Sequence, residues 1–341
     1  MQGKTMELMC TCGPTVNTPE MVAALIKEGI TTFRINFSYD TRPDHMQCAE
    51  IVRAGMKLAG KQAKLMGDIP GPKFRIGMFE GNKIQLAVGS KFILDSDNAT
   101  IGSQDRVFLP HSEMAKVVEV GDEIILNDGL VVVECTEKIF DSATSFKITT
   151  KCVQSGPISN NKGISIPCRL IKTPFPTEKD KVCIETANML NLEFLMLSFV
   201  QCPQDVLSVR ALAPHAHLMS KIETPVGVHN VEAIAEVSDS LLIARGDLGV
   251  EARLSRVPMI QKHMCKLFAG KKTIYCATQF LESMVNNKEP SFSEVNDIFN
   301  AIQDGVDGIL LAGETANGKW PVEAVRWLKN VVDQALAFKN Q

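Results

Sequence analysis

The chain has 341 residues, of which 45% are hydrophobic and 22% are charged, as in ordinary globular proteins. This length allows one large domain with an insertion, or two to three domains. The formal net charge of -3 gives no overall reason to expect nucleic acid or an anionic membrane as a partner. An anionic substrate would therefore have to be held by local cations.

Ten cysteines are scattered along the chain, without the CxxC or Cys/His spacing of a zinc site. We interpret them as reduced, buried thiols, and the sequence leaves disulfide pairing open. The N-terminus lacks the apolar core of a signal peptide, and no run of about 18 apolar residues occurs. These features predict a cytoplasmic protein.

The first part of the chain alternates strands with helices. Apolar or alternating runs predict strands at 6–11, 31–37 and 63–68, and helical periodicity predicts helices at 19–29 and 44–60. Because side chains at alternate strand positions share a face, Arg34, Asn36 and Ser38 are expected to line one wall. Arg34 stands between two apolar residues of a buried type of strand, where a guanidinium requires an anion as its partner.

The alternation stops after the third strand. Residues 74 to about 167 show β-type alternation with Gly, Asn and Asp turns and no convincing long helix, which predicts a separate β-rich domain. An insertion beside strand ends is well placed to act as a lid that excludes water during a reaction.

The alternation of helix and strand then resumes at Thr177. The further strands are expected at 194–200, 217–222, 240–244, 273–278 and 308–312. The further helices are expected at 178–189, 204–213, 225–237 and 257–269, within 280–304, and at 322–338.

These elements make eight βα units, the number of a (β/α)8 TIM barrel. We predict a barrel formed by 1–69 and 168–341, with a small β-barrel lid domain at 70–167 inserted after the third strand. A doubly wound open sheet is the alternative.

Charged residues end two neighbouring strands of this predicted barrel. Lys221 and Glu223 end the strand at 217–222, and Gly246 and Asp247 follow the next one; parallel strands place these ends on the same side. Two carboxylates suit Mg2+ or Mn2+, and a lysine beside them can neutralise an oxygen that gains negative charge. The glycine opens an expected turn whose bare N–H groups suit an anion. Either tetrapeptide, SKIE or GDLG, is commonly structural, but together they indicate a metal and anion site.

Eight motifs occur in the order RINFS, GDIPGPKFR, NDGL, NKGISIP, SKIE, ARGDLGVE, CATQFLESM and LAGETANG. With these motifs the chain strongly resembles the pyruvate kinase family over nearly its whole length. The resemblance implies a (β/α)8 barrel with a β lid after the third strand and, usually, a C-terminal regulatory domain. The chain stops after the eighth barrel helix, so we expect that domain to be absent, and with it activation by sugar phosphates.

The resemblance also implies the roles of the strand-end residues. Glu223 and Asp247 would hold the Mg2+ or Mn2+ that binds phosphoenolpyruvate, and Lys221 would stabilise the enolate and the phosphoryl group in flight. Thr278, together with the backbone N–H groups of Gly246 and Asp247, would hold the substrate carboxylate.

The nucleotide side is implied in the same way. Arg34 and Arg75 would hold the transferred phosphate and the nucleotide, with Asn36 beside them, while Asp128 and Lys162 on the lid would meet the second metal and the nucleotide phosphates. The implied reaction is in-line phosphoryl transfer from phosphoenolpyruvate to ADP and protonation of enolpyruvate, giving pyruvate and ATP.

The chain departs from the family pattern at the monovalent-cation site. That region would comprise Asn36, Ser38 and Asp68, but Ile69 and Lys73 replace the threonine and glutamate that support K+ in many members. The ammonium of Lys73 can take the electrostatic role of K+, so we expect activity that does not require K+.

Three further departures are Tyr39 in place of a histidine, Gln201 in place of an arginine and Ala312 in place of a serine. That serine is thought to belong to the hydroxyl and water chain that protonates enolpyruvate, so Ala312 is expected to slow or reroute this step. None of the three changes removes a metal ligand or Lys221.

Two other functions stay open: a metal-dependent oxoacid lyase or aldolase on the same site, and a noncatalytic binding protein. Asp128, Lys162 and Arg75 argue against the lyase, which needs neither a second metal nor a nucleotide. The complete set of strand-end residues argues against a noncatalytic protein. Homo-oligomerisation is also left open.

Overall fold

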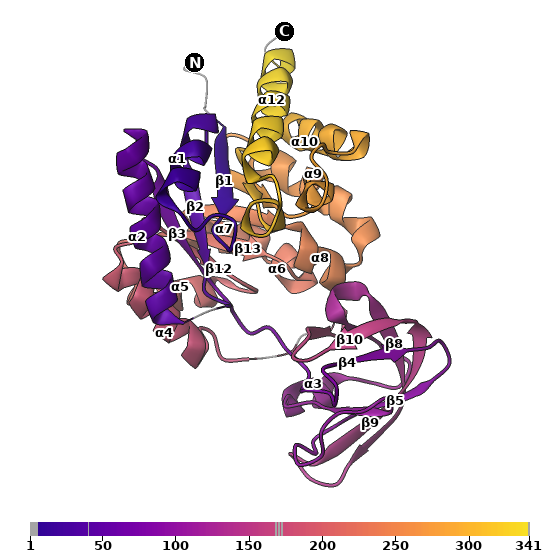
Figure 1. Ribbon diagram of the computed structural model, residues 1–341. Helices are drawn as coiled ribbons and strands as arrows, with labels where there is room; N and C mark the ends of the chain where they lie inside the picture. Colours follow the sequence, from indigo (N-terminus) through magenta and orange to yellow (C-terminus); the bar gives the residue numbers. More distant parts are fainter. Residues whose placement is uncertain (1–5, 40, 168, 170, 172, 340–341) are drawn as a thin grey trace.

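The computed structural model describes residues 6–39, 41–167, 169, 171 and 173–339. Eight parallel strands close into a barrel in the order β1, β16, β15, β14, β13, β12, β3, β2. Helices surround this barrel, and a β-rich domain projects from one side of it (Figure 1). The predicted (β/α)8 barrel is therefore confirmed, and the open-sheet alternative is wrong because β1 pairs with both β2 and β16.

The barrel strands are short and buried on both faces, which explains why they are nearly continuous apolar runs. Side chains from alternate positions, among them Met9, Met66, Met219 and Leu242, fill the barrel interior. The eight strands are β1 (Glu7–Thr11), β2 (Thr32–Asn36), β3 (Lys64–Ile69), β12 (Phe194–Leu197), β13 (His217–Ile222), β14 (Ser240–Ala244), β15 (Thr273–Ala277) and β16 (Gly308–Leu311).

The helices pack their apolar faces on the outside of the barrel, and their starts follow ordinary capping chemistry. Thr18 caps the first helix, and Thr177 and Ser291 begin capping boxes. The helices are α1 (Pro19–Glu28), α2 (Arg42–Ala59), α4 (Glu178–Met189), α5 (Pro203–Leu212), α6 (Pro225–His229), α7 (Val231–Val237), α8 (Arg245–Ala252), α9 (Val257–Phe268), α10 (Phe292–Asp304), α11 (Gly313–Ala316) and α12 (Pro321–Lys339). Two short 3-10 segments, η2 (Leu254–Arg256) and η3 (Glu282–Val285), lie between them.

Three local predictions were wrong. The helix expected at 225–237 is broken at Asn230, whose backbone angles of φ -95° and ψ 11° depart from helical values; its side chain donates to the carbonyl of Gln201 at 2.8 Å. The Gly-Asp-Leu-Gly segment lies within helix α8 and not in a turn. Strand β2 ends at Asn36, so Ser38 lies in the turn that follows and is not on the strand face.

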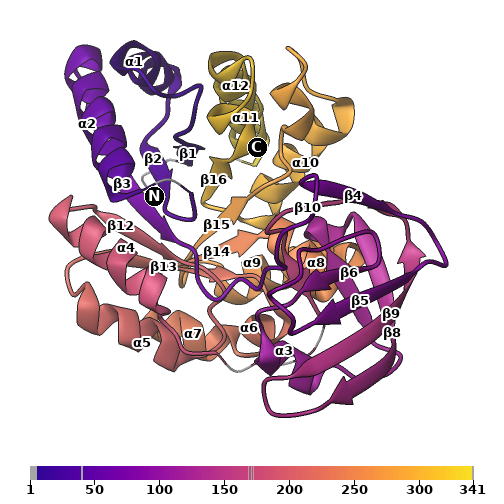
Figure 2. The ribbon, with the colours of Figure 1, turned by 60° about the horizontal axis from the view of Figure 1, so that its bottom comes forward.

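The inserted domain has its own apolar core and two sheets, ordered β10-β4 and β11-β7-β8-β9-β5-β6. Its strands are β4 (Lys83–Leu86), β5 (Lys91–Asp95), β6 (Arg106–Phe108), β7 (Glu123–Leu126), β8 (Val131–Phe140), β9 (Phe146–Gln154), β10 (Gly156–Ser159) and β11 (Ile164–Ser165), with helix α3 (Ser112–Val117) and the 3-10 segment η1 (Asn127–Gly129). Figure 2 shows this domain beside α8 and α6, and η1 contacts α8. The exact boundaries of the inserted domain, and its closure into a small β-barrel, stay predictions. The boundary residue 168 lies outside the described residues.

Two further predictions concern the cysteines and membrane-spanning segments. Within the described residues no disulfide joins the cysteines, and seven of them are buried: Cys10, Cys12, Cys135, Cys152, Cys183, Cys265 and Cys276. Cys168 lies outside this part of the chain. None of the helices in the described ranges is long and apolar enough to cross a membrane.

Candidate active site

A buried carboxylate, Asp68 at the end of β3, joins a cation from the neighbouring strand β2 and one from β13, which lies beyond β12. Its Oδ2 accepts hydrogen bonds from Arg34 Nε at 2.8 Å and Nη2 at 2.6 Å, and Lys221 Nζ lies 3.3 Å from Oδ1. Burial raises the pKa of Asp68, but the charges of Lys221 and Arg34 outweigh it and hold the pKa below its usual value. The anion that the sequence requires for Arg34 is therefore supplied by the chain itself.

Lys221 is buried among oxygen atoms at the end of β13. Besides Asp68, its Nζ contacts Ser198 Oγ at 2.7 Å and Glu223 Oε1 at 3.1 Å. Burial lowers the pKa of Lys221, but Asp68 and Glu223 outweigh this effect and raise it above its usual value. The lysine therefore stays charged inside the barrel mouth.

Glu223 is fully buried and only partly satisfied. Its Oε2 accepts the backbone N–H of Phe199 at 2.6 Å, whereas Oε1 has no hydrogen bond within the described structure, since its 3.1 Å contact with Lys221 lacks hydrogen-bond geometry. Burial raises the pKa of Glu223, and the nearby charge of Asp247 adds to this despite Lys221. An unsatisfied buried oxygen next to a second carboxylate fits a hard divalent cation.

The described residues contain no cluster of three or more His, Cys, Asp and Glu side chains placed to hold a metal. Glu223 and Asp247 would thus provide two carboxylates, a number that suits Mg2+, which usually keeps water and binds substrate oxygens as well. The donor set fits Mg2+ or Mn2+ and lacks the sulfur or histidine ligands typical of zinc.

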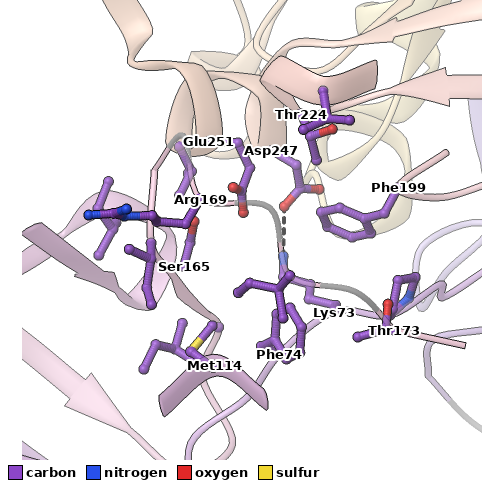
Figure 3. Close-up of a pocket in the computed structure, with 18 of the residues that line it drawn as sticks. Lys73, Phe74, Met114, Ser165, Arg169, Thr173, Phe199, Thr224, Asp247 and Glu251 are labelled. Carbon is purple, nitrogen blue, oxygen red and sulfur yellow. Dashed lines mark hydrogen bonds and ion pairs between the residues drawn. The ribbon is translucent and has the colours of Figure 1, made fainter. Parts of the chain in front are cut away.

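Asp247 lies in the first turn of α8 and contacts the inserted domain through Lys73. Lys73 Nζ donates to Asp247 Oδ1 at 2.8 Å and to Asp128 Oδ1 at 3.3 Å (Figure 3). Burial lowers the pKa of Lys73, but the two aspartates raise it well above its usual value. The described contacts of this ammonium are therefore with Asp247 and Asp128. Its role toward the region of Asn36, Ser38 and Asp68 stays a prediction.

A cavity lies between the barrel and the inserted domain. Figure 3 shows Asp247, Glu251 and Lys73 facing it, with Phe74, Met114 and Phe199 among its apolar walls. Gln201 and Asp128 also line it. Burial, with the nearby charges of Asp247 and Glu223, raises the pKa of Glu251 to about 7.

A second and larger cavity, of about 890 Å3, opens at the carboxyl ends of β1, β2 and β16. Arg34 and Asn36 line it together with Tyr39 and Ala312, two of the positions that depart from the family pattern. Arg34 is oriented there by Asp68 and by Thr11 Oγ1, to which its Nη1 donates at 3.0 Å. The cavity thus adjoins one of the two cations that Asp68 holds.

The loop after β15 carries Thr278, whose Oγ1 accepts the backbone N–H of Gly246 at 2.8 Å. The sequence reasoning expected this N–H to be bare, which is wrong: the hydroxyl of the neighbouring strand end occupies it. A direct hydrogen bond therefore links Thr278 to Gly246.

The two remaining basic residues lie on the inserted domain. Arg75 bridges to Gly163, its Nη1 donates to the carbonyl of Asn161 at 2.8 Å, and the carbonyl of Lys162 accepts the N–H of Ile76 at 3.0 Å. These contacts place Arg75 and Lys162 near each other within the inserted domain.

Sequence reasoning missed three residues that the fold brings to the site: Ser198, Glu251 and the backbone N–H of Phe199. Ser198 directly follows the apolar strand β12, and a polar residue at a strand's carboxyl end is the signal that identified the other site residues. Glu251 gave no signal, because its helix was read as a turn.

The closed barrel carries cations and carboxylates at the carboxyl ends of its strands, the end where (β/α)8 enzymes have their active sites. A family model described as pyruvate kinase, barrel domain, matches residues 3–325. The pyruvate kinase of Methylorubrum extorquens is 36% identical over 98% of this chain and 69% of its own length. That of Bacillus licheniformis is 37% identical over 96% of this chain and 57% of its own length. That of Mycobacterium tuberculosis is 33% identical over 96% of this chain and 69% of its own length. The chain belongs to the pyruvate kinase family and is a phosphotransferase of that family.

The Asp68 cluster predicts a pH-dependent loss of stability. Asp68→Asn leaves Arg34 and Lys221 without their shared countercharge, so we expect the free energy of unfolding at pH 7 to fall by about 3–5 kcal/mol. Urea unfolding followed by circular dichroism measures this loss, and the exposed Glu236→Gln serves as a charge control that should change it by less than about 0.5 kcal/mol.

The sign with pH follows from the lowered pKa of Asp68 in the folded state. Its stabilisation is present above the unfolded pKa, about 3.9, and is lost as pH falls through the lower folded value. The difference between wild type and Asp68→Asn should therefore shrink below about pH 4. A difference that stays constant in acid would contradict this account.

Proposed function

We propose that the chain transfers the phosphoryl group of phosphoenolpyruvate to ADP, giving pyruvate and ATP, with Mg2+ or Mn2+ as the divalent metal. The observation that carries the proposal is the buried Lys221 ammonium, held 3.1 Å from Glu223 and 3.3 Å from Asp68 at the strand ends. A charge in this position suits an enolate, and the family relationship supports this reaction over other enolate chemistry.

Glu223 and Asp247 would hold the metal, which would supply positive charge to the oxygens of the substrate. Lys221 faces the same site and neutralises the negative charge that develops as the phosphoryl group leaves. Because Asp68 and Glu223 keep it charged and fixed, no large reorganisation is needed during the reaction.

Arg34 provides a second fixed cation for the transferred phosphate. Its guanidinium is anchored by Asp68 and Thr11 and also lines the large cavity, where Asn36 and Tyr39 would contact the nucleotide. Arg75, Lys162 and Asp128 would approach the nucleotide phosphates from the inserted domain, which we propose acts as a lid.

The substrate carboxylate would lie against the first turn of α8 and Thr278. The first N–H groups of a helix have no partner within it, so this turn suits an anion. After the neighbouring strand β16, Ala312 has no hydroxyl, and its N–H donates to Glu314 Oε2 at 2.7 Å. Protonation of enolpyruvate must therefore use another hydroxyl or a water molecule.

The metal site is tested by Glu223→Gln, which keeps the side-chain shape and removes the charge. We expect pyruvate formation from phosphoenolpyruvate, ADP and Mg2+ to fall by at least about 100-fold, because one of two metal ligands is lost. Binding of Mn2+, followed by electron paramagnetic resonance, should weaken in parallel, while the exposed Glu236→Gln leaves both unchanged. Unchanged turnover in Glu223→Gln would refute the assigned metal ligand.

The nucleotide role of the lid is tested by Lys162→Ala. Loss of a phosphate-binding cation should lower pyruvate formation by at least about 100-fold, whereas Lys151→Ala, an exposed lysine of the same domain, should have little effect. A metal-dependent cleavage of oxoacids would be nearly insensitive to Lys162. Wild-type protein with that activity and no pyruvate formation from phosphoenolpyruvate would favour the lyase instead.

Independence from K+ is tested by assaying pyruvate formation with Mg2+ in K+-free buffer. Because the Lys73 ammonium would take the role of the monovalent cation, added KCl should change turnover by less than about twofold, with choline chloride holding the ionic strength constant. Many-fold stimulation by KCl would keep the kinase and discard the proposed role of Lys73.

A further inference from the structure

Arg245, the last residue before Gly246, is buried beneath the loop that follows β15. Its Nε and Nη2 donate to the carbonyl of Thr278 at 3.1 and 2.8 Å. Its Nη1 donates to Asp297 Oδ1 at 2.9 Å, and its Cζ lies 3.8 Å from the centre of the Phe280 ring. A carbonyl, a carboxylate and an aromatic face thus fix this guanidinium in one orientation.

The loop that Arg245 contacts has an unfavourable backbone conformation. Thr278 and Gln279 have φ angles of +72° and +58°, in the left-handed region that a β-branched threonine rarely adopts. Such a conformation persists only where the surrounding structure holds it. The two hydrogen bonds from Arg245 to the Thr278 carbonyl do this directly.

Gly246, the residue after Arg245, holds Thr278 at a second point. The backbone N–H of Gly246 donates to Thr278 Oγ1 at 2.8 Å, and a Cβ added at Gly246 would lie 3.3 Å from the same oxygen. Arg245 and Gly246 therefore hold both the carbonyl and the hydroxyl of Thr278, and the hydroxyl itself donates to the carbonyl of Ala277 at 2.6 Å.

We propose that Arg245 is a positioning residue, which fixes Thr278 against the first turn of α8 so that this turn and the hydroxyl form one carboxylate-binding surface when the hydroxyl turns its proton from the Ala277 carbonyl to the ligand. The inference rests on the proposed function, because it concerns the carboxylate of phosphoenolpyruvate. Neither Arg245 nor Thr278 lines the two cavities, but Thr278 joins the guanidinium of Arg245 to the backbone N–H of Gly246 in the first turn of α8, so Arg245 acts through Thr278.

A lysine cannot replace this guanidinium, because an ammonium is a point charge without the planar fork that reaches Asp297 and the Thr278 carbonyl together. Burial lowers the pKa of Arg245, but its anionic neighbours raise it, so the charge is retained. Arg245→Lys therefore keeps the charge and removes the positioning geometry.

The chain offers a matched control at the opposite end of the barrel. Arg210 donates to the carbonyl of Ala216 at 2.7 Å and pairs with Asp239, whose Oδ2 also accepts the backbone N–H of Leu218 at 2.7 Å. The same carbonyl-plus-carboxylate arrangement thus stands beside the amino ends of β13 and β14. Arg210→Lys should lower stability without affecting substrate binding.

The experiment compares Arg245→Lys and Arg210→Lys in steady-state kinetics and in calorimetric binding of oxalate in the presence of Mn2+ without nucleotide. For Arg245→Lys we expect the KM for phosphoenolpyruvate and the Kd for oxalate to rise by about 10- to 100-fold. The KM for ADP and the affinity for Mn2+ alone should change by less than about twofold. For Arg210→Lys all four quantities should stay near wild type.

Two further variants keep the test decisive if Arg245→Lys does not fold. Asp297→Asn loosens the guanidinium and should raise the same two quantities by a smaller factor, and guanidinium ion added to Arg245→Ala should restore part of the oxalate affinity. Equal loss of oxalate affinity in Arg210→Lys, or none in Arg245→Lys and Asp297→Asn, would overturn the positioning role. If the wild type forms no pyruvate, the proposed function fails, and oxalate binding still decides the role of Arg245.

Discussion

The site depends on one buried carboxylate that two cations share. Asp68 is 2% exposed, and its neighbours in the barrel register are Asn36 on β2 and Met196 on β12. That register brings it to the side chains of Arg34 and Lys221, which would repel each other without it. Since breaking such a buried arrangement leaves a charge without compensation, the barrel holds both cations in place before substrate arrives.

The carboxylates outnumber the cations toward the inserted domain, and Lys73 offsets part of this excess. Asp247, Glu223 and Glu251 lie near one another, as the raised pKa of Glu251 reflects. Lys73 contacts Asp247 on the barrel and Asp128 on the inserted domain, so one side chain links the position of the lid to a proposed metal ligand. A displacement of the inserted domain would therefore change the charge around this proposed ligand.

The barrel could be predicted because its strand and helix periods are strong and alternate regularly. Lys221 and Glu223 could be placed at the site since they stand at the carboxyl end of an apolar strand. The pairing of Arg34 with Asp68 could not, because it depends on the register between β2 and β3, which local patterns do not encode. Helix α8 was missed because two glycines disfavour a helix locally, and tertiary packing overrides that preference.

The two ends of the barrel use the same chemical arrangement for different purposes. At the amino end, Arg210 links the carbonyl of Ala216 to Asp239, in a place where the interactions of barrels generally serve stability. At the carboxyl end, Arg245 makes the corresponding link, but to a carbonyl whose residue has a left-handed backbone and whose hydroxyl accepts the N–H of Gly246 in the first turn of α8. A rigid helix-to-loop connection there holds a conformation that the loop would not keep alone. The two arginines therefore differ in the residue whose carbonyl they hold, Ala216 or Thr278, and not in the kind of contacts that they make.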